Sequence, residues 1–271
     1  MCRVLKVSPS GFYYWVKDPE GMRGREECAL KEKIKEIFYA NRKTYGSRRI
    51  HHALRRACVR CSRRRVCRLM RQLGLCPKRR RKFRLTTDSK HGFPVYANLL
   101  ARDFTSHASD SAWVGDITYI WTDEGWLFLA TLLDLYSRKV VGWSMSESLK
   151  SRVAIDALEM AINIRKPPAG LLHHSDRGVQ YACGAYQEVI TKAGMLPSMS
   201  RKGDCWDNSV AESFFSTLKK ELIYQRSFAT REEACREIFD FIEVFYNRQR
   251  MHSYLGNLSP TEFETVVRKA A

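Results

Sequence analysis

The spacing of apolar residues changes at about residue 109, and this change limits the folds open to the chain. Between residues 26 and 76 apolar side chains recur every three or four positions, as in Leu30, Ile34 and Phe38, which is typical of helices. After residue 109, segments rich in Val, Ile, Thr and aromatic residues alternate with turn signals, which is typical of strands. The sequence therefore predicts a small all-α unit with the short connections of a helix-turn-helix, followed by a larger α/β unit.

The α/β unit begins with segments of strand character at residues 113–118, 126–134 and 139–145. Turn signals separate them, so we expect a three-stranded antiparallel meander. Further along the chain we expect helices at 151–164, 185–193, 209–223 and 231–247, and strands at 170–174 and 196–200. A meander followed by alternating helices and strands indicates a mixed sheet with helices on its faces.

Basic residues concentrate in the first part of the chain. Residues 1–100 hold 27 Lys and Arg against 7 Asp and Glu, whereas residues 101–271 hold 20 against 22. A segment with this excess of positive charge binds a polyanion more tightly because binding releases the counterions condensed on the polyanion. Nucleic acid is therefore the expected partner. The alternative is a solvated basic face that only aids solubility. We divide the chain into a helical stub (1–25), a basic helix-turn-helix-like DNA-binding domain (26–76), a basic linker (77–108) and the α/β domain (109–268).

Cysteine content and hydropathy indicate the compartment. The nine cysteines are an odd number in a chain of 271 residues, which does not fit a small disulfide-rich secreted scaffold. The longest apolar run, residues 126–133, is too short to span a bilayer, and residues 1–20 lack the pattern of a signal peptide. We therefore expect a cytoplasmic, nucleoid-associated protein without membrane contact.

Three acidic residues lie at positions where a carboxylate is either energetically unfavourable to bury or typical of a functional site. Asp116 lies in the middle of an apolar strand, and Asp176 directly follows the short predicted strand 170–174, where α/β sheets commonly build sites. Glu212 lies on a predicted helix with Lys219 two turns later on the same face. Each residue also has a structural explanation: Asp116 as a hydrogen-bonding residue, Asp176 as a turn residue, and Glu212 as the acid of a capping box with Ser209.

Taken together, these acids predict a metal site. Three converging carboxylates repel one another unless a divalent cation neutralises them, and hard oxygen ligands suit Mg²⁺ or Mn²⁺. Two such ions side by side support in-line phosphodiester chemistry. A basic half that binds nucleic acid would supply the substrate.

Six stretches of the sequence, in this order, resemble the second-reading-frame transposases of bacterial insertion sequences, in the insertion sequence three family. The stretches are residues 45–50, 116–119, 133–143, 174–181, 207–215 and 246–252. Between Asp176 and Glu212 lie 35 residues, the spacing typical of this Asp-Asp-Glu family.

The resemblance implies a ribonuclease H-like fold and a transposase that cleaves insertion-sequence ends and transfers the strands. It implies two Mg²⁺ ions, with Asp116 bridging them and Asp176 and Glu212 each completing one coordination sphere. It also implies that Lys219 contacts a DNA phosphate and that no covalent protein–DNA intermediate forms.

Partners follow from the same resemblance. We expect double-stranded DNA at the element ends and target, a homo-oligomer on DNA, and an upstream-frame helix-turn-helix protein, because the chain begins at what resembles the end of that frame. The residues expected to contact DNA, besides Lys219, are Arg48, Arg49, Arg63, Arg64, Arg65, Arg79, Arg80 and Arg81. The competing functions are a structure-selective nuclease of the same fold and an inactive or partial transposase that acts as a DNA-binding regulator.

Other polar residues have plainer interpretations. His51, His52, Cys58 and Cys61 invite comparison with the zinc module of retroviral integrases, but their spacing does not match it, and we expect no zinc there. We expect His173 and His174 to be packing or hydrogen-bonding residues, and Asp207 a loop or capping residue. Arg250 either binds DNA or closes the C-terminal helix onto the core.

Overall fold

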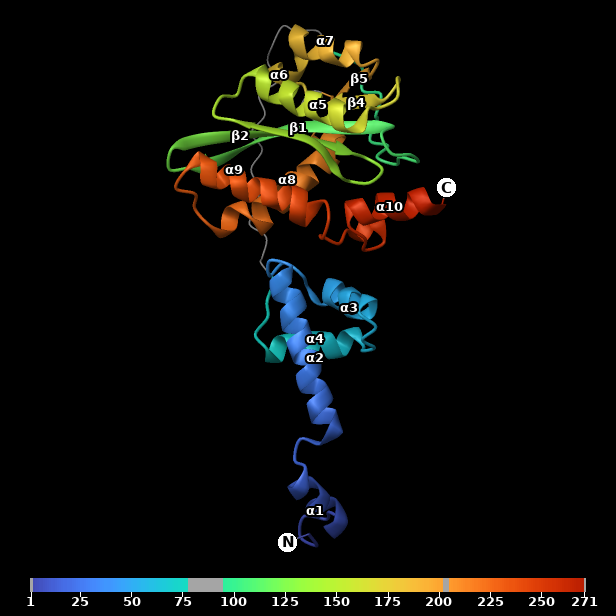
Figure 1. Ribbon diagram of the computed structural model, residues 1–271, viewed down its shortest axis with the longest axis vertical. Coiled ribbons are helices and arrows are strands. Elements are labelled where there is room, and N and C mark those ends of the chain that lie inside the picture. Colours follow the sequence, from blue (N-terminus) through green and yellow to red (C-terminus); the bar gives the residue numbers. More distant parts are fainter. Residues whose placement is uncertain (1, 78–94, 202–204, 271) are drawn as a thin grey trace. The chain divides into compact units, whose positions relative to one another are not determined.

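The computed structural model of the chain describes residues 2–77, 95–201 and 205–270 (Figure 1). The chain divides into two compact units, residues 1–78 and residues 79–271. The predicted DNA contacts Arg79, Arg80 and Arg81 lie outside the described residues. Among the described helices, none is both long enough and apolar enough to cross a membrane.

The first unit is entirely helical in the part that the structure describes. It consists of α1 (Pro9–Lys17), α2 (Gly21–Ala40), α3 (Ser47–Arg56) and α4 (Arg63–Gln72). The helical structure predicted for residues 26–76 from apolar spacing is confirmed, as α2, α3 and α4. Their apolar faces pack together, and the buried residues are Leu30, Ile34, Phe38, Tyr45, Ile50, Leu54, Val66, Leu69 and Met70.

The second unit is built on a five-stranded sheet with the strand order β3-β2-β1-β4-β5. Strands β1 (Ala112–Thr122), β2 (Gly125–Asp134) and β3 (Val140–Ser146) form the predicted antiparallel meander. Strands β4 (Leu172–Ser175) and β5 (Leu196–Met199) extend the sheet in parallel from the other side of β1. The fold is the mixed sheet that the sequence predicted, with β1 at its centre.

Helices cover both faces of this sheet (Figure 1). One face packs against α5 (Ser151–Arg165), α6 (Val179–Ala182) and α7 (Gly184–Lys192), and the other against α8 (Ser209–Glu221) and α9 (Arg231–Phe239). Successive residues of β1 serve opposite faces, because Trp113 belongs to the core with α5 whereas Val114 belongs to the core with α8. A central strand buried on both sides explains why β1 reads as an almost continuous apolar run.

The C-terminal part departs from the prediction. The expected helix 231–247 is α9 only as far as Phe239 and continues as a π-helix, Asp240–Tyr246. After it, the Asn247 side chain pairs with the backbone of β3, since its Oδ1 accepts from Val140 N–H at 3.0 Å and its Nδ2 donates to Val140 O at 3.0 Å. The short elements α6, Cys205–Asn208, Ile223–Gln225 and Ser253–Leu255, and the helix α10 (Pro260–Ala270), were not predicted.

Arg250 closes the C-terminal region onto the core. Its guanidinium donates to both carboxylate oxygens of Glu221 at 2.8 Å, and both side chains are largely buried. The interpretation of Arg250 as a core-closing residue is therefore confirmed.

Gly142 provides a test of the packing between β3 and α5. A Cβ at this position would lie 2.3 Å from the backbone O of Ala157 and 2.7 Å from the Cβ of Ala161. We expect Gly142→Ala to lower the free energy of unfolding by roughly 3 kcal/mol, because overpacking forces these elements apart. Denaturant unfolding followed by tryptophan fluorescence measures the effect, since five of the six tryptophans lie in the second unit.

Gly184→Ala is the matched control. A Cβ at Gly184 meets no atom within 4 Å, so this variant should be neutral or stabilised by up to about 1 kcal/mol. Equal stability of the Gly142→Ala variant and the wild-type protein would contradict the observed contact between β3 and α5.

Candidate active site

The strand pairing brings Asp116 and Asp176 to the same edge of the sheet. Strands β1 and β4 run parallel, and the last pair in their register is Val114 with His174. Asp116 and Asp176 each lie two residues beyond that pair, at corresponding positions past the end of the shared ladder. Both carboxylates therefore occupy the carboxyl-end edge where β4 stops and β1 continues.

Helix α8 supplies Glu212 to this edge. The Nδ2 of Asn208, at the N-cap of α8, donates to the backbone O of Gly115 at 3.2 Å, next to Asp116. Phe214 and Leu218 are buried in the core, which leaves the opposite side of the helix for polar residues. Glu212 follows one turn after Asn208 and is half-buried.

The capping-box interpretation of Glu212 is wrong. The N-cap of α8 is Asn208 rather than Ser209, and no side-chain capping hydrogen bond forms there. Ser209 is the first residue of the helix itself, so it cannot play the capping role that the pattern required.

Electrostatic interactions connect Asp116 to the other two acids. Burial raises the pKa of Asp116 well above its usual range, and the charges of Asp176 and Glu212 raise it further. A hydrogen bond from the Ile117 N–H and the charge of Lys219 oppose this rise. Burial also raises the pKa of Glu212. The site is thus a concentration of negative charge in a poorly solvated place.

Lys219 lies at the margin of this group. Burial lowers the pKa of its ammonium, and the charge of Asp116 opposes that effect. The Nζ atom lies 5.4 Å from the ring centroid of Tyr119, which is on β1 as well. Lys219 is therefore a cationic side chain whose charge interacts with that of Asp116.

The donor set suits a divalent cation in chemical type. All three side chains offer hard carboxylate oxygens, and each added negative charge makes the site more favourable for Mg²⁺ or Mn²⁺. Asp116 Oδ1 accepts a hydrogen bond from Ile117 N–H and Asp176 Oδ1 accepts one from Gly178 N–H, both at 2.8 Å. Among the described residues no three His, Cys, Asp or Glu side chains are close enough to form a ready-made metal cluster.

Asp207 is the centre of a structural network that the sequence did not predict. It is fully buried, and its carboxylate accepts hydrogen bonds from Asn98, Arg102 and Arg201. The hydrogen bond from the Arg201 side chain is the main reason that its pKa lies well below the usual range. Two of these partners are more than 100 residues away in the chain, so no local pattern could have revealed the network.

The two histidines before Asp176 are hydrogen-bonded core residues, as predicted. His173 Nε2 lies 2.9 Å from the Tyr186 hydroxyl, and His174 lies 2.9 Å from Ser198 Oγ and 3.1 Å from Ser200 Oγ. These contacts join β4 to α7 and to the end of β5, and so fix the strand that carries Asp176.

The described arginines predicted to bind DNA lie on α3 and α4 of the first unit. Arg48, Arg63 and Arg64 are exposed, whereas Arg49 and Arg65 are half-buried. The Arg49 guanidinium lies 5.4 Å from the ring centroid of Tyr45. Ser62 is the N-cap of α4, where its Oγ accepts a hydrogen bond from Arg65 N–H, and the first turn of the helix contains no acidic residue.

Comparison with known families identifies both units. Residues 25–83 match the HTH-like domain family, and residues 106–205 and 212–267 match two families described as integrase core domains. Asp116 and Asp176 fall within the first integrase core match, and Glu212 is the first residue of the second.

Similar proteins span almost the whole chain. The insertion element IS600 uncharacterized 31 kDa protein of Shigella sonnei is 44% identical over 263 residues, 97% of each chain. The transposase InsF for insertion sequence IS3A of Escherichia coli (strain K12) is 41% identical over 266 residues, which are 97% of this chain and 92% of the relative. Among solved structures, the HTLV-2 integrase catalytic core domain in complex with magnesium is 17% identical, with a TM-score of 0.44 over 57% of this chain and 95% of that one.

His173 makes the second unit sensitive to acid. Burial, with a smaller contribution from His174, lowers its pKa from 6.5 to about 3. In the unfolded chain this imidazole takes up a proton near pH 6.5, whereas in the folded protein it stays neutral until about pH 3. The contribution of the neutral imidazole to the free energy of unfolding is therefore fully present above pH 6.5 and decreases as the pH falls below 6.5. The loss reaches about 2 kcal/mol by pH 5.

We expect His173→Gln to reduce the dependence of stability on pH between 6.5 and 5, measured by denaturant unfolding at each pH. His174, whose burial lowers its pKa to about 4, retains its own contribution. His107→Gln, at an exposed position of the same unit, is the control and should leave the dependence unchanged. An unaltered dependence in the His173→Gln variant would show that this imidazole is not buried in neutral form.

Proposed function

Because the chain belongs to the IS3-family insertion-sequence transposases, which carry an integrase core, we propose that Asp116, Asp176 and Glu212 are its catalytic carboxylates. The observation that supports this most is the electrostatic coupling of Asp116 to both other acids at one edge of the sheet. Members of this family act on DNA and move insertion-sequence DNA.

The integrase core family is metal-dependent, and we propose that this chain uses two divalent cations, Mg²⁺ or Mn²⁺. Asp116, Asp176 and Glu212 would hold the ions through their carboxylate oxygens. When bound, the ions supply charge stabilisation at the attacking and leaving oxygens of a phosphodiester.

The proposed reaction has two phosphoryl-transfer steps. In the first, water attacks phosphorus at the element end and the P–O3′ bond breaks, which leaves a 3′-hydroxyl. In the second, that 3′ oxygen attacks a phosphorus of target DNA, the target P–O3′ bond breaks, and the element end is joined to target. No serine or tyrosine of the chain forms a covalent bond to DNA in this scheme.

Basic residues position the substrate in this proposal. Lys219, beside Asp116, would hold a phosphate near the scissile bond, and its partial burial strengthens that interaction. Arg48, Arg49, Arg63, Arg64 and Arg65, with Arg79, Arg80 and Arg81, would bind the DNA backbone outside the active site. The domain boundaries 26–76, 77–108 and 109–268 remain part of the proposal, as do a homo-oligomer on DNA and an upstream-frame partner.

Neutralising any of the three acids should remove activity. We expect Asp116→Asn, Asp176→Asn and Glu212→Gln each to reduce Mg²⁺-dependent cleavage and strand transfer by more than about 100-fold, because each removes a charged metal ligand. Labelled DNA that carries the element's ends reports both steps on a denaturing gel. Chelation of divalent cations should abolish both products.

Asp123→Asn is the matched control, since Asp123 is an exposed carboxylate at the β1–β2 turn. It should retain wild-type activity. Full activity in the Asp116→Asn variant would refute the assignment, and cleavage without strand joining would favour a nuclease over a transposase.

The metal site also has a stability signature. Without divalent cations, Asp116→Asn should raise the melting temperature, because it removes a desolvated charge that Asp176 and Glu212 repel. Mg²⁺ at ten times its Kd should stabilise the wild-type protein by about 1.4 kcal/mol, or about 3–6 °C, and should not stabilise the variant. Thermal melts with and without Mg²⁺ measure both effects, and equal Mg²⁺ responses in the two proteins would contradict the site.

A further inference from the structure

The part of the first unit that contains α3 and α4 has no acidic residue. Residues 37–77 contain 12 Lys and Arg, and no Asp or Glu occurs between Glu36 and Asp88. Positive charge in this segment can therefore be balanced only from residues 18–36 within the unit, or by a ligand.

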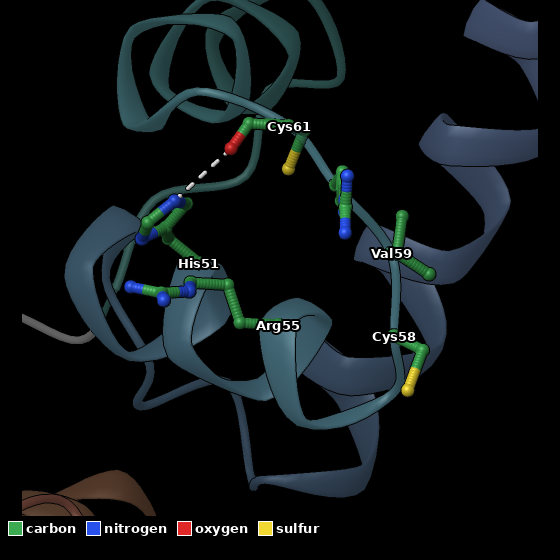
Figure 2. Close-up of a pocket in the computed structure, with 6 residues that line it drawn as sticks. His51, Arg55, Cys58, Val59 and Cys61 are labelled. Carbon is green, nitrogen blue, oxygen red and sulfur yellow. Dashed lines mark hydrogen bonds between the residues drawn. The ribbon is translucent and has the colours of Figure 1, made fainter.

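A pocket of about 690 Å³ opens between α3 and the loop that leads to α4. It is lined by His51, Arg55, Cys58, Val59, Arg60 and Cys61 (Figure 2). His51 and Arg55 lie one turn apart on α3, and the segment 58–61 forms the facing wall. Arg60, in the segment 58–61, therefore lines the same pocket as Arg55.

Local hydrogen bonds fix the conformation of the segment 58–61. Cys58 adopts a left-handed backbone conformation with φ 58°, which turns the chain at the end of α3, and Val59 N–H donates to Leu54 O at 2.9 Å. His51 Nε2 donates to the Cys61 carbonyl at 3.1 Å, because a carbonyl oxygen can only accept (Figure 2). The pocket is therefore a formed feature of the helix–loop–helix rather than a gap between loose segments.

The two arginines of the pocket differ from Arg25 and Arg68 of the same unit. Arg25 and Arg68 are paired with Asp18 and Glu27. Arg55 and Arg60 are exposed, and neither forms an ion pair with any described carboxylate. Two cationic side chains in the lining of one pocket, with no acidic residue in that lining, favour an anion as its ligand.

A metal ion fits this pocket poorly. His51 uses its Nε2 proton on the Cys61 carbonyl, so this nitrogen is engaged in a hydrogen bond. The two arginines would also repel a cation.

We infer that this pocket binds the phosphodiester backbone of DNA, with Arg55 and Arg60 as the phosphate-contacting residues. The inference rests on the proposed function, in which the first unit positions element DNA. It adds a contact site made by the end of α3 and the α3–α4 loop, separate from Arg63, Arg64 and Arg65 on α4.

Salt dependence tests the assignment. With the full chain and a fluorescent DNA duplex, the Arg55→Ala/Arg60→Ala variant should lower the slope of log K against log salt concentration by about 2, since two phosphate contacts are lost. The control Arg23→Ala/Lys33→Ala removes the same charge from exposed positions of α2 and should change the slope much less. Equal changes in both double variants would mean that only net charge matters and would overturn the inference.

Cys58 provides a second readout that does not depend on the arginine variants. It is exposed and lines the pocket, whereas Cys28 is exposed on α2 outside the pocket. Burial raises the pKa of the Cys61 thiol, so Cys58 is the better reporter. Duplex DNA should slow maleimide labelling of Cys58 several-fold relative to Cys28, measured by mass spectrometry of peptides.

The outcomes separate the two proposals. If DNA binds and the Asp116→Asn variant loses cleavage while Cys58 remains unprotected, the pocket assignment fails and the proposed function stands. If the wild-type chain neither binds nor cleaves DNA, the proposed function fails and the pocket assignment fails with it.

Discussion

Repulsion among carboxylates at one edge of the sheet is the constraint on which the rest of the second unit depends. Asp116 lies on the strand that both cores bury, beside Asp176 and Glu212, and its pKa is raised by burial and by both charges. Such a site lowers the stability of the isolated protein. The hydrogen-bonded histidines of β4, the buried Asp207 network and the pairing of Asn208 with Gly115 hold the surrounding elements in place.

The two units divide the chemistry by charge. Residues 37–77 of the helical unit hold 12 Lys and Arg and no acidic residue, which suits the backbone of DNA, whereas the α/β unit brings three acids to one edge of its sheet. A transposase of this family needs both, because the scissile phosphate must be brought to a site whose own charge repels it. Lys219, beside Asp116, and the bound cations would overcome that repulsion.

The sequence predicted the regular elements well, because their apolar spacing is a local property. The spacing of Leu30, Ile34 and Phe38 predicted α2, and the alternation along β1 placed Asp116 mid-strand. Prediction from the sequence failed where the structure is determined by contacts between residues far apart in the chain. The contact of Asn247 with Val140 and those of Asp207 with Asn98 and Arg102 join residues more than 100 positions apart. The predicted N-cap, Ser209, is one residue past the observed one, Asn208. The sequence singled out the three acids, but only the strand register of β1 and β4 shows why Asp116 and Asp176 meet.

The most direct test of the central claim is anomalous diffraction from crystals of the protein grown with Mn²⁺. The account predicts anomalous peaks in contact with carboxylate oxygens of Asp116, Asp176 and Glu212, with those side chains rotated towards the ions. Well-ordered crystals at saturating Mn²⁺ with no peak among these three residues, or with peaks only elsewhere on the protein, would contradict it.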